Sequence, residues 1–207
     1  MADIELHDEV DSERTVVAID RLAELGSTAR MPFSKALGDG LFELRFTLGP
    51  TARRITYRFT TNNRIILLTT FRKQRNNERA DCSRSPNRRR MRSAQPLEDI
   101  TMANYSRWDD VKKQRPAPSD ETRASIEQNF ALGELIYELR TQAELSQREL
   151  AERMGTTQSV ISRLEEGGGA RNRLDTLARV ATALDRHLGV SFPEEVPKRL
   201  KDAVQVA

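Results

Sequence analysis

The chain has 207 residues, 34 Lys and Arg against 31 Asp and Glu, and 37% hydrophobic residues. This length allows one or two domains with cores of their own and excludes a disulfide-stapled miniprotein. The single cysteine, Cys82, cannot form an internal disulfide, so a cytoplasmic location is expected. No stretch approaches the roughly 20 apolar residues of a membrane span, and the N-terminus is acidic. We therefore expect neither membrane contact nor secretion.

The net charge of +3 conceals an uneven distribution along the chain. Residues 35–92 carry 15 Lys and Arg against four acids, whereas residues 1–34 carry three Arg against eight acids. Residues 101–207 are nearly neutral, with 16 bases and 17 acids. The basic block indicates a phosphate-bearing partner, although a solvated basic face or a disordered arm explains the charge equally well.

The N-terminal third of the chain predicts a helix followed by strands. Apolar residues at helical spacing between residues 11 and 25 predict a helix that Gly26 ends. Apolar and polar residues alternate over 42–48 and again over 54–59, and an apolar run follows at 65–71. These patterns predict a three-stranded antiparallel meander, with residues 3–6 as an extra edge strand.

Between about residue 80 and Pro118, apolar residues show neither the spacing of a helix nor the alternation of a strand. Four prolines interrupt any helix there, and Arg and Ser are frequent between residues 81 and 96. We therefore expect a linker at residues 81–124 that is disordered or only locally ordered.

Residues 125–192 predict an all-helical domain, followed by a charged tail at 193–207. Apolar residues at helical spacing mark a first helix near 132–139 and a last one near 174–184. Between them, Ser146 and Glu149 form a capping-box pattern that begins one short helix, and a second begins near Thr157 and stops at Gly167.

Two short helices joined by Gly155-Thr156-Thr157 form a helix-turn-helix pattern. The stretch LSQRELAERMGTTQSVISRLEEG, residues 145–167, closely resembles the Xre/Cro family of DNA-binding domains, which includes HigA-like antitoxins. The resemblance covers about residues 130–188 and implies a lambda-repressor-like domain of four to five helices. A homodimer on double-stranded operator DNA is expected, because two half-sites multiply the modest attraction of a near-neutral domain.

The second short helix of this pattern carries the residues expected to read DNA. If its apolar residues face inward, four polar side chains face outward: Gln158, Ser159, Ser162 and Arg163. The family pattern assigns base contacts to Gln158, Ser159 and Arg163, and phosphate contacts to Gln147, Thr157 and Ser162. Glutamine can pair with adenine and arginine with guanine, each pair contributing about 1–3 kcal/mol of discrimination. Thr157 is also expected to cap the helix, and each residue taken singly is equally an ordinary exposed polar side chain.

The N-terminal half carries no Cys/His cluster, phosphate-binding glycine loop or Gly-x-Ser-x-Gly motif, so we expect no metal and no cofactor. Three segments, MPFSKALGDGLFELR (31–45), RRITYRF (53–59) and IILLTTFRK (65–73), resemble the RelE/HigB-like toxins, in their phage-derived Gp49-like branch. The resemblance covers about residues 13–79. It implies an α+β domain at residues 1–80, a helix plus a small antiparallel sheet, and cleavage of messenger RNA on the ribosome.

In that chemistry a 2′-hydroxyl attacks the adjacent phosphate, so the site must stabilise negative charge and move protons. Positions that match the family nominate Arg45 and Arg54 as phosphate holders, Lys73 as a further charge and Tyr57 as a proton carrier. Tyr57 shares a strand face with Ile55 and Phe59, so a plain core position is its alternative. The segment after residue 80 departs from the family, because the run at 81–96 replaces an expected helix.

The sequence thus predicts a fused toxin–antitoxin polypeptide that binds operator DNA and represses its own operon. Intramolecular toxin–antitoxin contact, in one chain or in a dimer, would mask the basic sheet. One alternative is a ribosome-dependent mRNA endoribonuclease retained in the N-terminal domain; whether that domain is an enzyme stays open, and we expect it to be inactive or masked. Another is a regulator that carries a dead toxin remnant as a dimerisation or RNA-binding module.

The loss of periodicity near residue 80 lies just before an internal Met102-Ala103. We hypothesise that a toxin reading frame shifted near Ala80 and continued into a downstream antitoxin gene that began at Met102. The other two DNA frames across codons 80–101 test this idea, and one of them is expected to encode an apolar-periodic helix. If neither does, the hypothesis fails.

Overall fold

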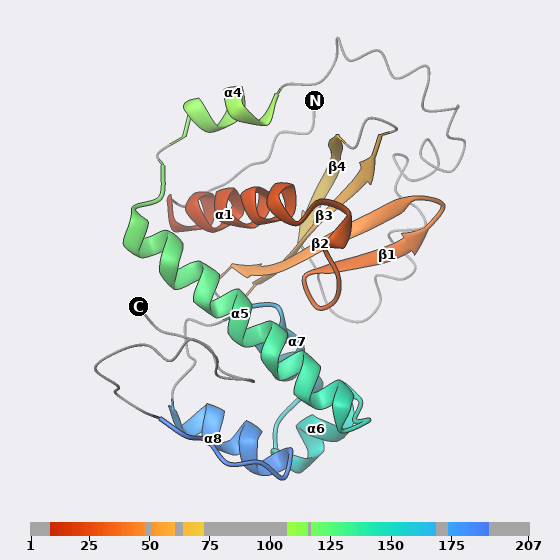
Figure 1. The fold of residues 1–207 in the computed structure, drawn as a ribbon, viewed down its shortest axis with the longest axis vertical. Helices are drawn as coiled ribbons and strands as arrows, with labels where there is room; N and C mark the ends of the chain where they lie inside the picture. The colour runs from red at the N-terminus through yellow and green to blue at the C-terminus, as the bar shows by residue number, and fades with distance from the viewer. Residues whose placement is uncertain are drawn as a thin grey trace.

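The computed structural model describes residues 9–48, 51–60, 64–72, 107–115, 117–168 and 174–190. The helices α1 and α4 and a sheet lie in the upper half of Figure 1, and the short helices α6 and α8 lie in the lower half. The long helix α5 (Asp120–Gln142) runs past both halves. The expected arrangement of an α+β domain joined to an all-α domain is confirmed.

The N-terminal half is a helix packed on a four-stranded antiparallel sheet of order β1-β2-β3-β4. The helix is α1 (Glu9–Leu25), followed by the short 3-10 helix η1 (Gly26–Thr28). The strands are β1 (Ser34–Gly38), β2 (Leu41–Leu48), β3 (Thr51–Phe59) and β4 (Ile65–Arg72). The last three confirm the predicted meander, whereas β1 was not predicted, because its five residues do not alternate between apolar and polar. The candidate strand at residues 3–6 lies outside the described residues.

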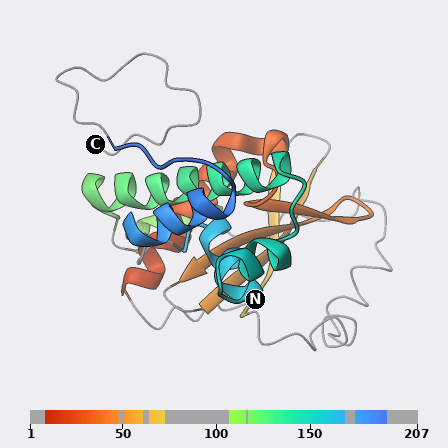
Figure 2. The same ribbon diagram turned by 90° about the horizontal axis from the view of Figure 1, so that it is seen from below.

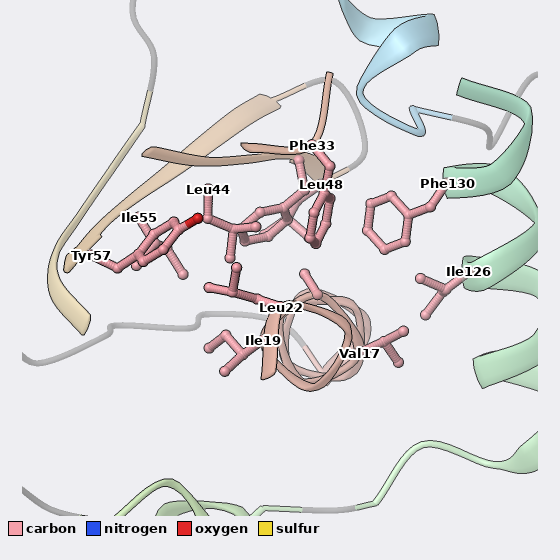
Figure 3. Packing of buried hydrophobic residues seen from close by; sticks show 12 residues of the cluster. Val17, Ile19, Leu22, Phe33, Leu44, Leu48, Ile55, Tyr57, Ile126 and Phe130 are labelled. Atoms are coloured by element: carbon pink, nitrogen blue, oxygen red, sulfur yellow. The ribbon is translucent and has the colours of Figure 1, made fainter. Parts of the chain in front are cut away.

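The core of this half is completed by a helix from much later in the chain. Leu22 of α1 points toward the sheet and Val17 points toward α5, whose Ile126 and Phe130 join the same buried cluster. Figure 3 shows both α5 side chains pointing toward α1 and the sheet. The rings of Phe33 and Phe130 meet edge to face, with their centroids 5.2 Å apart. The core of the N-terminal half is therefore not confined to residues 1–80.

Part of the expected linker is folded against α1. The short helix α4 (Trp108–Lys113) and the first turn of α5 both lie within residues 81–124. Asp20 accepts hydrogen bonds from Trp108 Nε1 at 2.8 Å, Lys112 Nζ at 3.0 Å and Arg123 Nη2 at 3.0 Å. These tertiary contacts order a stretch in which no apolar period is visible.

The C-terminal half is built from α5 and three shorter helices, α6 (Gln147–Arg153), α7 (Gln158–Glu165) and α8 (Leu174–Ala183). The predicted capping box at Ser146 is confirmed: the Ser146 backbone N–H donates to Glu149 Oε2 at 2.7 Å, and the Glu149 N–H donates to Ser146 Oγ at 3.2 Å. The residues that fill this core were mostly expected from their spacing: Ile136, Leu150, Ala151, Met154, Ile161, Leu164, Val180, Ala183 and Leu184. The expected tail at 193–207 lies outside the described residues.

The C-terminal end of α7 lies close to α5 and to the core of the N-terminal half at two glycines, Gly133 and Gly167. A Cβ on Gly133 of α5 would collide with the backbone carbonyl of Glu165. Gly167 follows α7 with a φ of +70°, and a Cβ there would meet the Phe130 ring at 2.7 Å. The absence of both side chains therefore lets the end of α7 lie against α5 and the sheet domain.

Asp20 provides a pH test of the contact between α1 and the residues that follow it. Burial alone would raise the pKa of Asp20, but the hydrogen bonds from Trp108, Lys112 and Arg123 outweigh burial and lower the pKa below its ordinary value. Its contribution to stability is therefore complete above the unfolded pKa of about 3.9 and is lost as pH falls through the folded value. The Tm difference between wild type and Asp20→Asn should be largest at neutral pH and should shrink below about pH 4.

Thermal unfolding followed by circular dichroism measures this difference. Asp110→Asn is the control, because Asp110 is 57% exposed and pairs with Lys113 on the surface. A Tm difference for Asp20→Asn that stays constant across this pH range would contradict the assignment.

Gly133 provides a test of the contact between α5 and α7. Gly133→Ala gains helix propensity, but its methyl group meets a backbone carbonyl that cannot move without displacing α7. We expect a net loss of about 1–3 kcal/mol in the free energy of unfolding, as for other overpacked sites. Gly189→Ala is the control, because a Cβ at Gly189 meets nothing within 4 Å. Equal stabilities of the two variants in urea unfolding would rule the close contact out.

Candidate nucleic-acid interfaces

Arg45 and Arg54 lie side by side on the sheet. They are direct cross-strand partners in the antiparallel pairing of β2 with β3, so their side chains leave the same face. Both are largely buried, with side chains 11% and 2% exposed. We call Arg45 and Arg54 the arginine pair.

The arginine pair binds a carboxylate from the helix-turn-helix half of the chain. Arg54 Nη1 donates to Glu166 Oε2 at 3.0 Å and Arg54 Nη2 donates to Glu166 Oε1 at 2.7 Å, a bidentate contact. Arg45 Nη2 donates to the same Oε1 at 3.0 Å, and Ser162 Oγ donates to it at 2.9 Å. Glu166 caps the C-terminal end of α7 and is 2% exposed.

A second carboxylate belongs to the sheet itself. Glu43 Oε1 lies 3.5 Å from Nε of Arg45 and 3.5 Å from Nε of Arg54. Counted over the described residues, the cluster therefore holds two guanidinium groups and two carboxylates, and without Glu166 it would carry one excess positive charge. Removing one partner from such a cluster leaves an uncompensated buried charge, which is strongly unfavourable.

The other two catalytic candidates are placed differently. Lys73 lies outside the described residues. Tyr57 has no exposed surface and shares a 2.6 Å hydrogen bond with Ser34 Oγ, so the core position expected as its alternative is confirmed. Burial raises the pKa of Tyr57, an effect that the bond to Ser34 offsets only in part. Its hydroxyl therefore stays protonated at neutral pH.

The N-terminal end of α7 is open to solvent. Thr157, Gln158 and Ser159 are exposed, and Arg163 is half-buried, with its Nε donating to the Ser159 carbonyl at 3.1 Å. Thr157 occupies the N-cap position of α7, as predicted, although its side chain makes no capping hydrogen bond. Gln158 and Ser159 lie at the N-terminal end of α7, the end that helix-turn-helix domains insert into the major groove, whereas Arg163 lies in the last turn of the same helix.

The structure contradicts the predicted orientation of Ser162. Its expected outward orientation is wrong, because Ser162 is buried and its hydroxyl holds Glu166. The helical pattern of α7 distinguishes the face toward its own domain from the rest of the helix. The pattern does not indicate that the sheet domain, with its arginine pair, covers part of the remaining surface of α7.

The phosphate candidate Gln147 is held by a chain of hydrogen bonds. Gln158 Nε2 donates to Gln147 Oε1 at 2.8 Å, and Gln147 Nε2 donates to Glu165 Oε2 at 2.6 Å. Arg140 completes the chain, with Nε 2.5 Å from Glu165 Oε1. These bonds fix Gln147 at the N-terminus of α6, close to backbone N–H groups that can also hold a phosphate oxygen.

Sequence reasoning missed Glu165 and Glu166. Two adjacent acids at a helix end look like solvated surface, yet their exposures are 1% and 2%. One signal was available: carboxylates are unfavourable at a helix C-terminus, where the helix dipole is negative. Their presence at that end therefore calls for cationic partners, which Arg140, Arg45 and Arg54 provide.

The described residues contain neither a candidate metal cluster nor a candidate membrane-spanning helix. Across these ranges, no group of three or more His, Cys, Asp and Glu side chains is placed to hold a metal ion. Within the same part of the chain, no helix has both the length and the apolar character needed to cross a membrane.

Comparison with known proteins divides the chain in the same way. Residues 3–89 match the family of phage-derived Gp49-like proteins. Residues 136–190 match a helix-turn-helix family. No curated protein and no solved structure matches the chain. The first match contains the arginine pair, and the second contains Glu166 together with the exposed end of α7.

Proposed function

Since the chain joins a Gp49-like, toxin-like domain to an Xre-like helix-turn-helix DNA-binding domain, we propose that it is a sequence-specific regulator of antitoxin type that represses its own operon. The observation that carries the proposal is the exposed N-terminal end of α7, where Gln158 and Ser159 are open to solvent. Their side chains, with Arg163, supply the donors and acceptors that read base edges in the major groove. A cytoplasmic location follows from the proposed DNA partner.

We propose further that the chain acts as a homodimer on a two-fold symmetric operator. Residues 101–207 are nearly neutral, so one domain attracts DNA phosphates only modestly. Two half-sites one helical turn apart overcome this weakness. Among the described residues, three large apolar side chains are exposed and offer a surface for such a contact: Leu174, Leu188 and Val190.

Binding of the full chain to DNA tests the proposal. A binding site is first selected from a random duplex library, and affinity is then measured by fluorescence anisotropy on the selected and on random DNA. Arg163→Ala should weaken binding to the selected site by roughly 5- to 150-fold and relax preference at one base pair. Gln147→Ala should weaken binding about equally on both DNAs, because a phosphate contact carries no sequence information.

Lys113→Ala is the charge-matched control, because Lys113 lies on α4 and is 77% exposed. It removes one positive charge outside the helix-turn-helix and should leave base preference unchanged. Equal losses on selected and random DNA for Arg163→Ala would refute the role of Arg163 in base reading.

A second candidate function is a ribosome-dependent mRNA endoribonuclease in the N-terminal domain. The observation that favours it is the arginine pair, whose guanidinium groups converge on one carboxylate oxygen. Such groups stabilise charge that develops on phosphorus, but they stay protonated and cannot act as bases. Proton transfer would fall to other groups, and Lys73 stays a candidate for a further positive charge at the site. Because Ile126 and Phe130 complete the core, the full chain rather than residues 1–80 is the material in which to measure cleavage.

A further inference from the structure

Glu166 enters the N-terminal domain at the point where an anion would bind. One of its oxygens, Oε1, accepts hydrogen bonds from three donors: Arg54 Nη2 at 2.7 Å, Ser162 Oγ at 2.9 Å and Arg45 Nη2 at 3.0 Å. Two of these donors come from adjacent strands, and the third comes from the helix that carries Glu166. Donors that converge on a single oxygen are typical of an oxyanion site.

The charges of the cluster match a phosphodiester. Without Glu166, two guanidinium groups face the single carboxylate of Glu43, which leaves one excess positive charge. A phosphodiester carries one negative charge, as Glu166 does, and both groups accept a bidentate pair of hydrogen bonds from arginine. The carboxylate therefore has the charge and the hydrogen-bonding pattern of a backbone phosphate.

Domain adhesion alone does not account for this contact. Buried ion pairs stabilise a fold weakly in comparison with apolar packing, because desolvation offsets their attraction. The two halves already share the apolar contact of Ile126 and Phe130 with α1 and the sheet, and a further ion pair joins Arg21 to Glu134 at 2.9 Å. The arginine pair is also poorly suited to holding two domains together, because two buried guanidinium groups require carboxylate partners to compensate their charge.

We propose that Glu166 is a built-in competitor that occupies an RNA phosphate site in the same chain and holds it closed. This inference rests on the second candidate function, the nuclease-like N-terminal domain. Glu166 follows the DNA-reading helix directly, yet Gln158 and Ser159 at the other end of α7 stay exposed. The closed chain can therefore present its DNA-reading residues while its RNA site is blocked.

Glu166→Gln in the full chain tests the inference. The probe is a single-stranded RNA oligonucleotide with 2′-O-methyl groups, which cannot be cleaved, and binding is followed by fluorescence anisotropy. The variant keeps the size of the side chain but removes its charge, so it should bind the probe at least about tenfold more tightly than wild type. Adding Arg54→Ala to Glu166→Gln should return the affinity to the wild-type value.

Glu134→Gln is the matched control. It removes another ion pair between the two halves, the one with Arg21, and leaves the arginine pair untouched, so its RNA affinity should equal that of wild type. Circular dichroism melts establish that each variant is folded. If Glu166→Gln does not fold, Glu166→Asp replaces it, because a side chain one methylene shorter keeps the charge but loses the bidentate reach; its affinity should also exceed that of wild type.

Three results would overturn the inference. The first is an unchanged RNA affinity in a folded Glu166 variant, the second is an equal gain in Glu134→Gln, and the third is a gain that survives Arg54→Ala. A cleavage assay with translating ribosomes and unmodified mRNA separates this inference from the nuclease candidate. Tighter RNA binding without cleavage supports the closed phosphate site and refutes a retained nuclease, whereas cleavage by Glu166→Gln supports both.

Discussion

The buried contact between Glu166 and the arginine pair is the constraint on which the arrangement of the two halves depends. Charges removed from water must be compensated nearby, and Glu43 neutralises only one of the two guanidinium groups. The second charge is compensated by a residue at the end of α7. Figure 2, seen from below, shows short helices of the C-terminal half in front of strands of the sheet, and the contact of Glu166 with Arg54 joins these two parts of the chain. A carboxylate of the DNA-binding half thereby lies within the toxin-like half.

Helix α5 makes this arrangement possible, because it belongs to both cores. Its first half supplies Ile126 and Phe130 to the sheet domain, and its second half supplies Ile136 to the helix-turn-helix core. The family matches end at residue 89 and begin at residue 136, so neither contains the first half of α5. At Gly133, between the two sets of contacts, the absent side chain lets α7 approach. The connecting segment is thus a structural part of both domains.

Local patterns predicted those elements whose burial follows a simple period. The helix α1, the strands β2 to β4 and the capping box at Ser146 are cases in which neighbouring residues decide the structure. The patterns failed where a distant partner decides it. Strand β1 has no apolar alternation and forms because β2 pairs with it, and α4 is held through Trp108 and Asp20. Ser162 was expected to face solvent because the apolar pattern of its helix does not show that the sheet domain covers this side of α7.

By itself, the sequence determined the two kinds of domain and the residue types that each presents to nucleic acid. Arginines on a small sheet and polar side chains at the start of α7 follow from alternation, helical spacing and family resemblance. Only the tertiary structure decided that Glu166 meets Arg54, since these residues are 112 positions apart in the chain. Periodicity compares neighbours within one element, whereas a buried ion pair is selected by charge balance between elements that the fold brings together.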